Sequence, residues 1–170
     1  MHLLKSDRFL VSVKILVMNE QKTIYMMVGI PGSGKSTWIQ EHIESNWIVL
    51  SPDTILEQRY NYQWTPERAA EAWAESYRSF GALLLKGTTI VWDATLISPI
   101  IRAAILHTSK GAGYRVEAVF CDTPIQICLD RNANRAREPV PESAIRRMAD
   151  SLVAPTEEEG FDKIHHIVVD

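Results

Sequence analysis

The amino-acid sequence predicts an α/β fold in which a five-stranded parallel sheet is covered by helices on both faces. Five short apolar runs recur along the chain, and a segment with helical periodicity follows each of the first four. The runs are nearly continuous rather than alternating, as in parallel strands that are buried on both faces. Right-handed crossovers between such strands align the loops at their carboxyl ends along one edge of the sheet, where ligands bind.

The first half of the chain supplies three of the expected strands. The pair Thr65-Pro66 is typical of a helix N-terminus, because a hydroxyl caps the helix and proline fits its first position, and Gly87 ends the same helix. The expected elements are a strand at 23–30, a helix from Gly34 to about Ser45, a strand at 47–50, a helix from Pro66 to Gly87 and a strand at 88–92.

The second half supplies the other two strands. Ser98-Pro99 repeats the signal for a helix start, and the residues REPVP at 137–141 interrupt a helical pattern that begins at Pro124. The expected elements are a helix from Pro99 to Gly111, a strand at 114–121, a helix from Pro124 to Ala136, a helix through Ile145 and Leu152, and a strand at 165–169.

Composition and length bound the function. The chain has 170 residues, 46% of them hydrophobic, and a net charge of −3, so a site for a polyanion has to be local. No stretch approaches the roughly 20 apolar residues of a membrane span, so we expect no membrane partner and a cytoplasmic location. We expect residues 1–22 to be an N-terminal extension and residues 23–170 to form one domain, and the sequence carries no signal for an oligomeric state.

The nine residues GIPGSGKST at 29–37 form a complete phosphate-binding loop between a strand and a helix. Glycine allows backbone N–H groups to approach phosphate oxygens closely, and the helix that follows adds the positive end of its dipole. The alternative is a glycine-rich turn without a ligand. We expect a P-loop domain that binds a nucleotide through Gly29, Pro31, Gly32, Ser33, Gly34, Lys35, Ser36 and Thr37.

Two aspartates follow other strands of the predicted sheet. Asp53 is a candidate general base, because a carboxylate at this edge can accept the proton of an attacking hydroxyl, and the alternative is a helix N-cap. Asp93 is a candidate for the Mg²⁺ site together with the Ser36 hydroxyl, and the alternative is a turn that ends the strand.

Two arginines lie one helical turn apart in the segment from Pro124 to Ala136. At spacing i and i+4, Arg131 and Arg135 are expected to share a helix face, from which they can stabilise charge on a transferring phosphoryl group. The alternative is a solvated face of the helix. The five tryptophans are predicted to pack in the core or between helices, and Trp64 is expected to be the most exposed of them and able to stack on a base.

With these residues in place, the sequence resembles the 5′-hydroxyl polynucleotide kinases, both the phage type and the kinase module of bacterial RNA-repair enzymes. The resemblance covers most of residues 23–170. An arginine and an asparagine followed by a second arginine, as in DRNANR, is typical of the lid of that family. The segments that carry the resemblance are GIPGSGKSTW, SPD, VWDAT, AVFCDTPIQICLDRNANR, VPESAIRRM and EGFDKIHHIVV.

This resemblance implies an adenylate-kinase-like P-loop fold with an arginine lid, which uses ATP and Mg²⁺ to phosphorylate the 5′-OH end of RNA or DNA. Carried over by position, Lys35 and Ser36 serve the phosphates and the metal, Asp53 is the general base, and Arg135 acts on the transferring phosphate with help from Arg131.

One departure from the family affects the acceptor. Leu56 occupies the position at which the family commonly has an arginine that holds the acceptor's phosphate, and Arg59 lies one helical turn further along. A small-molecule kinase acting on a nucleoside, sugar or antibiotic therefore stays open as an alternative. A nucleotide-gated binding module without transfer activity is a third reading, although it needs neither a base nor lid arginines.

Overall fold

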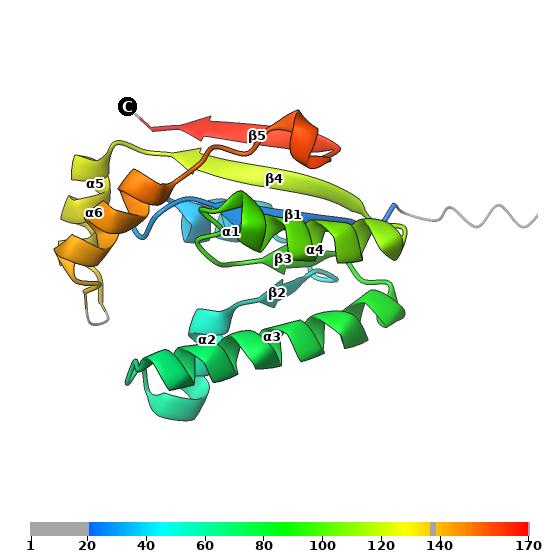
Figure 1. The fold of residues 1–170 in the computed structure, drawn as a ribbon, viewed down its shortest axis with the longest axis horizontal. Coiled ribbons are helices and arrows are strands. Elements are labelled where there is room, and N and C mark those ends of the chain that lie inside the picture. The colour runs from blue at the N-terminus through cyan, green and yellow to red at the C-terminus, as the bar shows by residue number, and fades with distance from the viewer. Residues whose placement is uncertain (1–20, 137–138, 170) are drawn as a thin grey trace, which may run out of the picture.

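The computed structural model describes residues 21–136 and 139–169, so all but the last two residues of the expected N-terminal extension lie outside it. Five parallel strands form one sheet in the order β2-β3-β1-β4-β5, and helices lie on both of its faces (Figure 1). The expected α/β fold is therefore confirmed. The strands are β1 (Thr23–Val28), β2 (Ile48–Leu50), β3 (Ile90–Trp92), β4 (Arg115–Asp122) and β5 (Lys163–Val168).

Strand β1 occupies the centre of the sheet, paired with β3 on one side and β4 on the other. The chain runs from β1 to the edge strand β2, returns to β3 and then crosses over β1 to β4. The direction of winding reverses beside the carboxyl end of β1, which is where open parallel sheets bind ligands. The glycine-rich loop at 29–34 leaves β1 at this point.

The capping signals in the sequence match the helix termini. The Thr65 side chain accepts a hydrogen bond from the backbone N–H of Arg68 at the start of α3, and Ser98 caps α4 through the N–H of Ile100. The helices are α1 (Lys35–His42), α2 (Pro52–Tyr60), α3 (Pro66–Lys86), α4 (Pro99–Gly111), α5 (Ile125–Ala133) and α6 (Glu142–Ser151), and none in the described ranges is long and apolar enough to cross a membrane.

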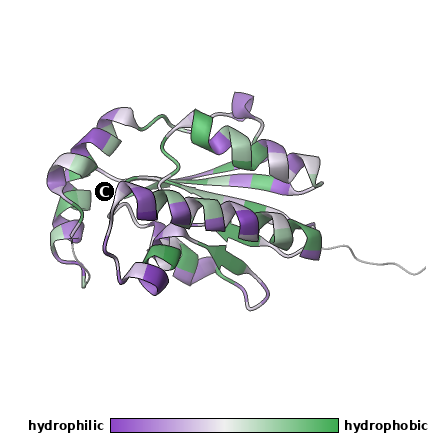
Figure 2. Cartoon of the chain, turned by 60° about the horizontal axis from the view of Figure 1, so that its bottom comes forward, coloured by the Kyte–Doolittle hydropathy of each residue, from purple (hydrophilic) through white to green (hydrophobic). Residues whose placement is uncertain are grey.

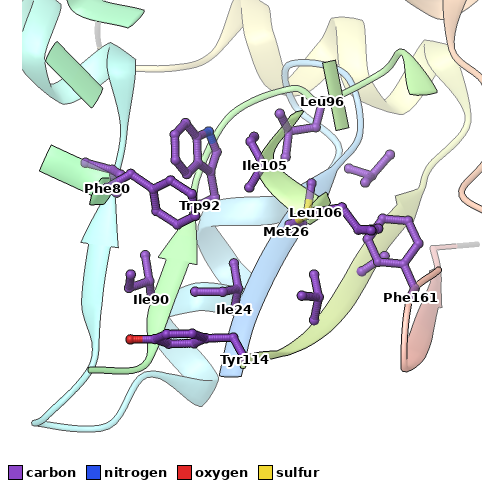
Figure 3. Close-up of a cluster of buried hydrophobic side chains, with 14 of the residues drawn as sticks. Ile24, Met26, Phe80, Ile90, Trp92, Leu96, Ile105, Leu106, Tyr114 and Phe161 are labelled. Atoms are coloured by element: carbon purple, nitrogen blue, oxygen red, sulfur yellow. The ribbon is translucent and has the colours of Figure 1, made fainter. Parts of the chain in front are cut away.

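Apolar side chains fill both faces of the sheet. On one face, Trp92 and Met26 pack with Phe80 of α3 and Ile105 of α4 (Figure 3). On the other, Met27 and its neighbours are covered by α1. The central strands show much green, whereas the helices alternate between purple and green, as expected for helices with one buried side (Figure 2).

Three helices differ from the expectation. Helix α1 ends at His42 rather than near Ser45. Helix α2 covers residues between the second strand and Pro66, where the sequence predicted no regular element. Helix α5 ends at Ala133 rather than at Ala136, so the predicted extent was wrong. The side-chain amides of Asn132 and Asn134 bond to the backbone oxygens of Val140 and Asp130 at 2.8 Å each, and such bonds compete with continued helix.

A buried ion pair fixes the loop after β3. The Arg102 side chain is fully buried, and its guanidinium donates two hydrogen bonds to the carboxylate of Glu159, at 2.8 and 2.6 Å. It also donates to the backbone oxygens of Leu96 and Val153, at 2.9 Å each. The same loop accepts a hydrogen bond from the N–H of Gly29 through the carbonyl of Thr95, at 3.1 Å. Arg102 thus secures the segment against which the phosphate-binding loop rests.

Candidate active site

A cavity of about 460 Å³ opens at the carboxyl edge of the sheet. Its wall is built from the glycine-rich loop, the first turn of α1, the first turn of α2, Trp73 of α3 and the segment that follows β3, together with Arg131, Asn132, Arg135 and Val140. Elements that are far apart in the sequence therefore meet at the point where the winding of the sheet reverses.

The glycine-rich loop lines the cavity and also packs against α5. Gly32 and Gly34 have φ angles of 84° and 101°, in the region that glycine alone adopts readily. A Cβ atom on Gly32 would lie 2.4 Å from the carbonyl oxygen of Cys128, so the loop contacts the α5 backbone directly. Pro31, Ser36 and Thr37, which the sequence also predicts as nucleotide contacts, line the wall as well.

Two residues of the predicted nucleotide site lie behind this wall. Ser33 is buried, and its backbone oxygen accepts a hydrogen bond from the Thr123 hydroxyl at 2.9 Å. Gly29 lies close to Ser33, because a Cβ atom there would be 2.5 Å from the Ser33 Oγ. Neither residue lines the cavity. In this structure both support the shape of the loop from its inner side.

Lys35 begins α1 and points back into the loop. Its Nζ donates hydrogen bonds to the backbone oxygens of Gly29 and Ile30, at 2.9 Å each. Burial lowers the pKa of this ammonium, and the nearby carboxylates of Asp93 and Asp53 act in the opposite direction. The cation is thus held at the loop by two neutral acceptors, which phosphate oxygens can replace.

Asp53 lies in the first turn of α2 and lines the cavity. The side chain that caps this helix is Ser51, whose Oγ accepts a hydrogen bond from the N–H of Thr54 at 3.4 Å. The alternative interpretation of Asp53 as the cap is therefore wrong. Its side chain is exposed, which suits a carboxylate that has to receive a proton from an incoming acceptor.

Asp93 directly follows β3, and its N–H donates to the Leu50 oxygen of the neighbouring strand at 2.9 Å. Asp93 and Ser36 line the same cavity. Within the described residues, no group of three or more His, Cys, Asp or Glu side chains could enclose a metal. A carboxylate and a hydroxyl fit Mg²⁺, which is commonly bound through one or two carboxylates together with substrate phosphates and water.

Arg131 and Arg135 both line the cavity, but not as a pair on one helix face. Arg131 lies in the last turn of α5, and its Nη1 donates to the Gly32 oxygen at 3.3 Å. Arg135 lies beyond the end of that helix. The helical reasoning that paired them was therefore wrong, although the fold brings both guanidinium groups to the same wall.

Asn132 links the end of α5 to the chain at Val140. Its amide nitrogen donates to the Val140 oxygen at 2.8 Å, and its Oδ1 accepts from the Val140 N–H at 3.0 Å. The same Oδ1 accepts a hydrogen bond from Arg135 Nη1 at 3.4 Å. Asn132 is buried and lines the cavity, and its side chain links Arg135 to the backbone of Val140. Sequence reasoning missed this role.

The structure shows the surroundings of Leu56, where the sequence departs from the polynucleotide kinases. Leu56 is buried in α2, with 7% of its surface exposed. Arg59 does not line the cavity, because its guanidinium forms an ion pair with Glu75 of α3 at 2.6 Å. Arg59 is therefore not in a position to replace the missing arginine in this structure. Trp73, which the sequence suggested was ordinary packing, lines the cavity instead.

Comparisons with known proteins agree with this architecture. The AAA domain family model matches residues 24–155. A protein of Acanthamoeba polyphaga mimivirus, named as a bifunctional polynucleotide phosphatase/kinase, is 26% identical over 157 residues. That match covers 86% of this chain but 33% of the viral protein.

Solved structures share the fold. A chain of the Pnkp1/Rnl/Hen1 RNA repair complex is 25% identical with a TM-score of 0.68, and the match covers 78% of this chain and 44% of the other. The APS kinase CysC of Mycobacterium tuberculosis, solved with AMPPNP and APS, is 22% identical with a TM-score of 0.54. That match covers 86% of this chain and 88% of the kinase.

The chain spans a third of the length of the viral relative and under half of the repair protein, as the coverage of 33% and 44% indicates. The expected resemblance to polynucleotide kinases is confirmed by both matches, and the P-loop kinase fold is shared with the APS kinase. The chain belongs to the AAA domain family, and over most of its length it is similar to polynucleotide kinases.

Proposed function

We propose that the protein is an ATP-dependent phosphotransferase that moves the γ-phosphate of ATP to the 5′-OH end of RNA or DNA. One observation carries this proposal: a carboxylate, a lysine and two arginines line a single cavity beside a phosphate-binding loop. These residues are Asp53, Lys35, Arg131 and Arg135. A nucleotide-gated binding module needs no general base, so phosphoryl transfer explains this set of residues better than nucleotide binding alone.

In the proposed reaction, the loop N–H groups and Lys35 hold the β- and γ-phosphates, and Asp53 accepts the proton of the acceptor hydroxyl. The acceptor oxygen forms a bond to the γ-phosphorus as the bond to the bridging oxygen of ADP breaks. Arg131 and Arg135 stabilise the negative charge that spreads over the phosphoryl oxygens. Bound at Ser36 and Asp93, Mg²⁺ would neutralise part of the phosphate charge. A cytoplasmic location is part of the proposal, because it suits an enzyme that consumes ATP.

A small-molecule kinase of the same fold is the second candidate. The burial of Leu56 and the ion pair of Arg59 with Glu75 favour it, because neither residue lines the cavity to hold an acceptor phosphate. The two candidates differ in the acceptor and share the same transfer chemistry.

A transfer assay separates them. The protein is incubated with ATP labelled at the γ-phosphate and with a 5′-OH oligonucleotide, or with a panel of nucleosides and sugars. The proposal expects label on the oligonucleotide. Label on a small molecule alone would replace the first candidate by the second, and the absence of label from every acceptor would contradict both.

The lid arginine offers an independent test. We expect Arg135→Ala to lower turnover by about 10³-fold while ATP still binds, because the guanidinium acts on charge that develops during transfer. Arg146→Ala is the matched control, since Arg146 pairs with Glu142 on the exposed side of α6 and does not line the cavity. Equal turnover in the two variants would remove Arg135 from the mechanism.

A further inference from the structure

The cations of the cavity serve the phosphoryl donor. Lys35 bonds to the phosphate-binding loop, and Arg131 donates to the oxygen of Gly32 in the same loop. Arg135 is held by Asn132 at the end of α5. In the proposed reaction all three groups act on ATP or on the moving phosphoryl group. Because these three cations bind the phosphoryl donor, we expect the acceptor to be recognised by a residue that is not a cation.

Apolar and aromatic side chains line the same cavity as Asp53. Pro52 precedes Asp53, and Val140 and Trp73 also line the cavity. Among the described residues, Leu56 of α2 is buried and Arg59 forms an ion pair with Glu75, so α2 presents no arginine to the cavity. Trp73 is the one aromatic residue among the described residues that line the cavity.

The indole of Trp73 is held in place by other rings. Its centroid lies 6.0 Å from that of Tyr77 and 6.2 Å from that of Trp92, both in tilted arrangements. Trp92 is fully buried and packs edge-on against Phe80 at 4.8 Å. Trp73 is half-buried against this cluster and borders the cavity. A ring that is already ordered loses little conformational entropy when a ligand stacks on it.

We propose that Trp73 is the acceptor-recognition residue, and that it stacks on the base of the nucleoside whose 5′-OH is phosphorylated. The inference rests on the proposed transfer reaction and narrows its substrate class. The acceptor is a hydroxyl on a sugar that carries a nucleobase, held by its ring rather than by the phosphate that follows it. Stacking on an aromatic side chain tolerates any base, so the proposal predicts weak sequence preference at the 5′ end.

The test compares two oligonucleotides that differ only at the 5′-terminal nucleotide, one with its base and one abasic. Both carry a 5′-OH, and transfer from ATP is measured as kcat and KM for each. We expect kcat/KM to be about tenfold higher for the oligonucleotide with the base, which corresponds to about 1.4 kcal/mol. A free nucleoside should also accept phosphate, whereas a sugar without a base should be a poor acceptor.

Variants of Trp73 test whether its indole causes the preference for an acceptor with a 5′-terminal base. Trp73→Ala should lower kcat/KM for the base-bearing oligonucleotide by about tenfold and leave the abasic one unchanged, while Trp73→Phe should recover most of the loss. Trp64→Ala is the matched control, because Trp64 is 65% exposed and does not line the cavity. Thermal unfolding and the Kd of ATP are measured for each variant. A general loss of packing would lower transfer to both oligonucleotides alike.

The outcomes separate this inference from the proposed function. Equal use of the two oligonucleotides by the unaltered protein would overturn the inference and leave the transfer reaction standing. An equal loss on both acceptors in Trp73→Ala, without recovery in Trp73→Phe, would also overturn it. No transfer to either oligonucleotide would overturn the proposed acceptor and the inference with it.

Discussion

Replacing Gly32 by alanine should destabilise the protein more than the same change at Gly34, two residues along the same loop. Both glycines have positive φ angles, 84° and 101°, so each alanine meets a backbone strain of about 1–2 kcal/mol. At Gly34 the nearest atom to the added Cβ is Arg131 Nη1, at 3.8 Å, which is ordinary contact. At Gly32 the Cβ lies 2.4 Å from the Cys128 oxygen and 3.0 Å from its Cα.

The atoms that oppose the Gly32 substitution belong to the backbone of α5 and cannot move alone. Overpacking of this kind costs about 1–3 kcal/mol, so Gly32→Ala should lower the free energy of unfolding by about 2–5 kcal/mol, against about 1–2 for Gly34→Ala. Urea denaturation of both variants measures the difference. Adding Cys128→Ala should not relieve the effect, because the Cys128 side chain is not the group in contact.

Two results would refute this reasoning. If Gly32→Ala and Gly34→Ala lost the same free energy of unfolding, the loop would not be braced against α5. If Cys128→Ala restored the stability of Gly32→Ala, the contact would be with the side chain rather than with the helix backbone. The predicted result would show that the phosphate-binding loop packs tightly against α5, the helix that carries Arg131. A substitution that displaces the loop should then also displace that helix.

Three further predictions follow from the contacts around the site. Asn132→Ala should lower turnover with little change in the Kd of ATP, because the backbone groups of Val140 and the Arg135 guanidinium lose their partner. Asn134→Ala, which loses one exposed hydrogen bond, should leave turnover unchanged, and equal turnover in the two variants would contradict this prediction. Arg102→Ala should cost about 3–5 kcal/mol of stability in chemical denaturation, since it leaves a carboxylate near the core without its partner, and a loss under about 1 kcal/mol would contradict the role of the ion pair. Burial raises the pKa of the Cys121 thiol to about 11, so the folded protein should react with iodoacetamide at this residue far more slowly at pH 8 than the unfolded chain does, as read by mass spectrometry; equal rates would show that the thiol is accessible and ionised.

The sequence predicted the elements that carry strong local signals. The fifth strand was placed within two residues of its start at Lys163, and hydroxyl caps followed by proline marked the starts of α3 and α4. The glycine-rich loop was found from its pattern because it needs particular residues at fixed spacing. These features depend on short-range chemistry that a linear sequence contains.

Features that depend on contacts between distant residues were missed. The end of α5 is set by the hydrogen bonds of Asn132 to Val140, eight residues further along, and no periodicity reveals such a partner. Trp73 fits the apolar stripe that predicts the buried side of α3. That pattern does not reveal that the same side chain also lines the cavity. The ion pair of Arg59 with Glu75 likewise joins two helices. The spacing along α2 suggested instead that Arg59 could replace the arginine that is missing at Leu56.

The central claim is that Asp53 acts on the acceptor hydroxyl and takes no part in holding ATP. The most direct measurement compares the Kd of ATP and the rate of phosphate transfer to a 5′-OH oligonucleotide in Asp53→Asn, which keeps the size of the side chain and removes its basic oxygen. The account predicts an unchanged Kd and a transfer rate lowered by about 10²–10⁴-fold. A transfer rate close to that of the unaltered protein would contradict the claim.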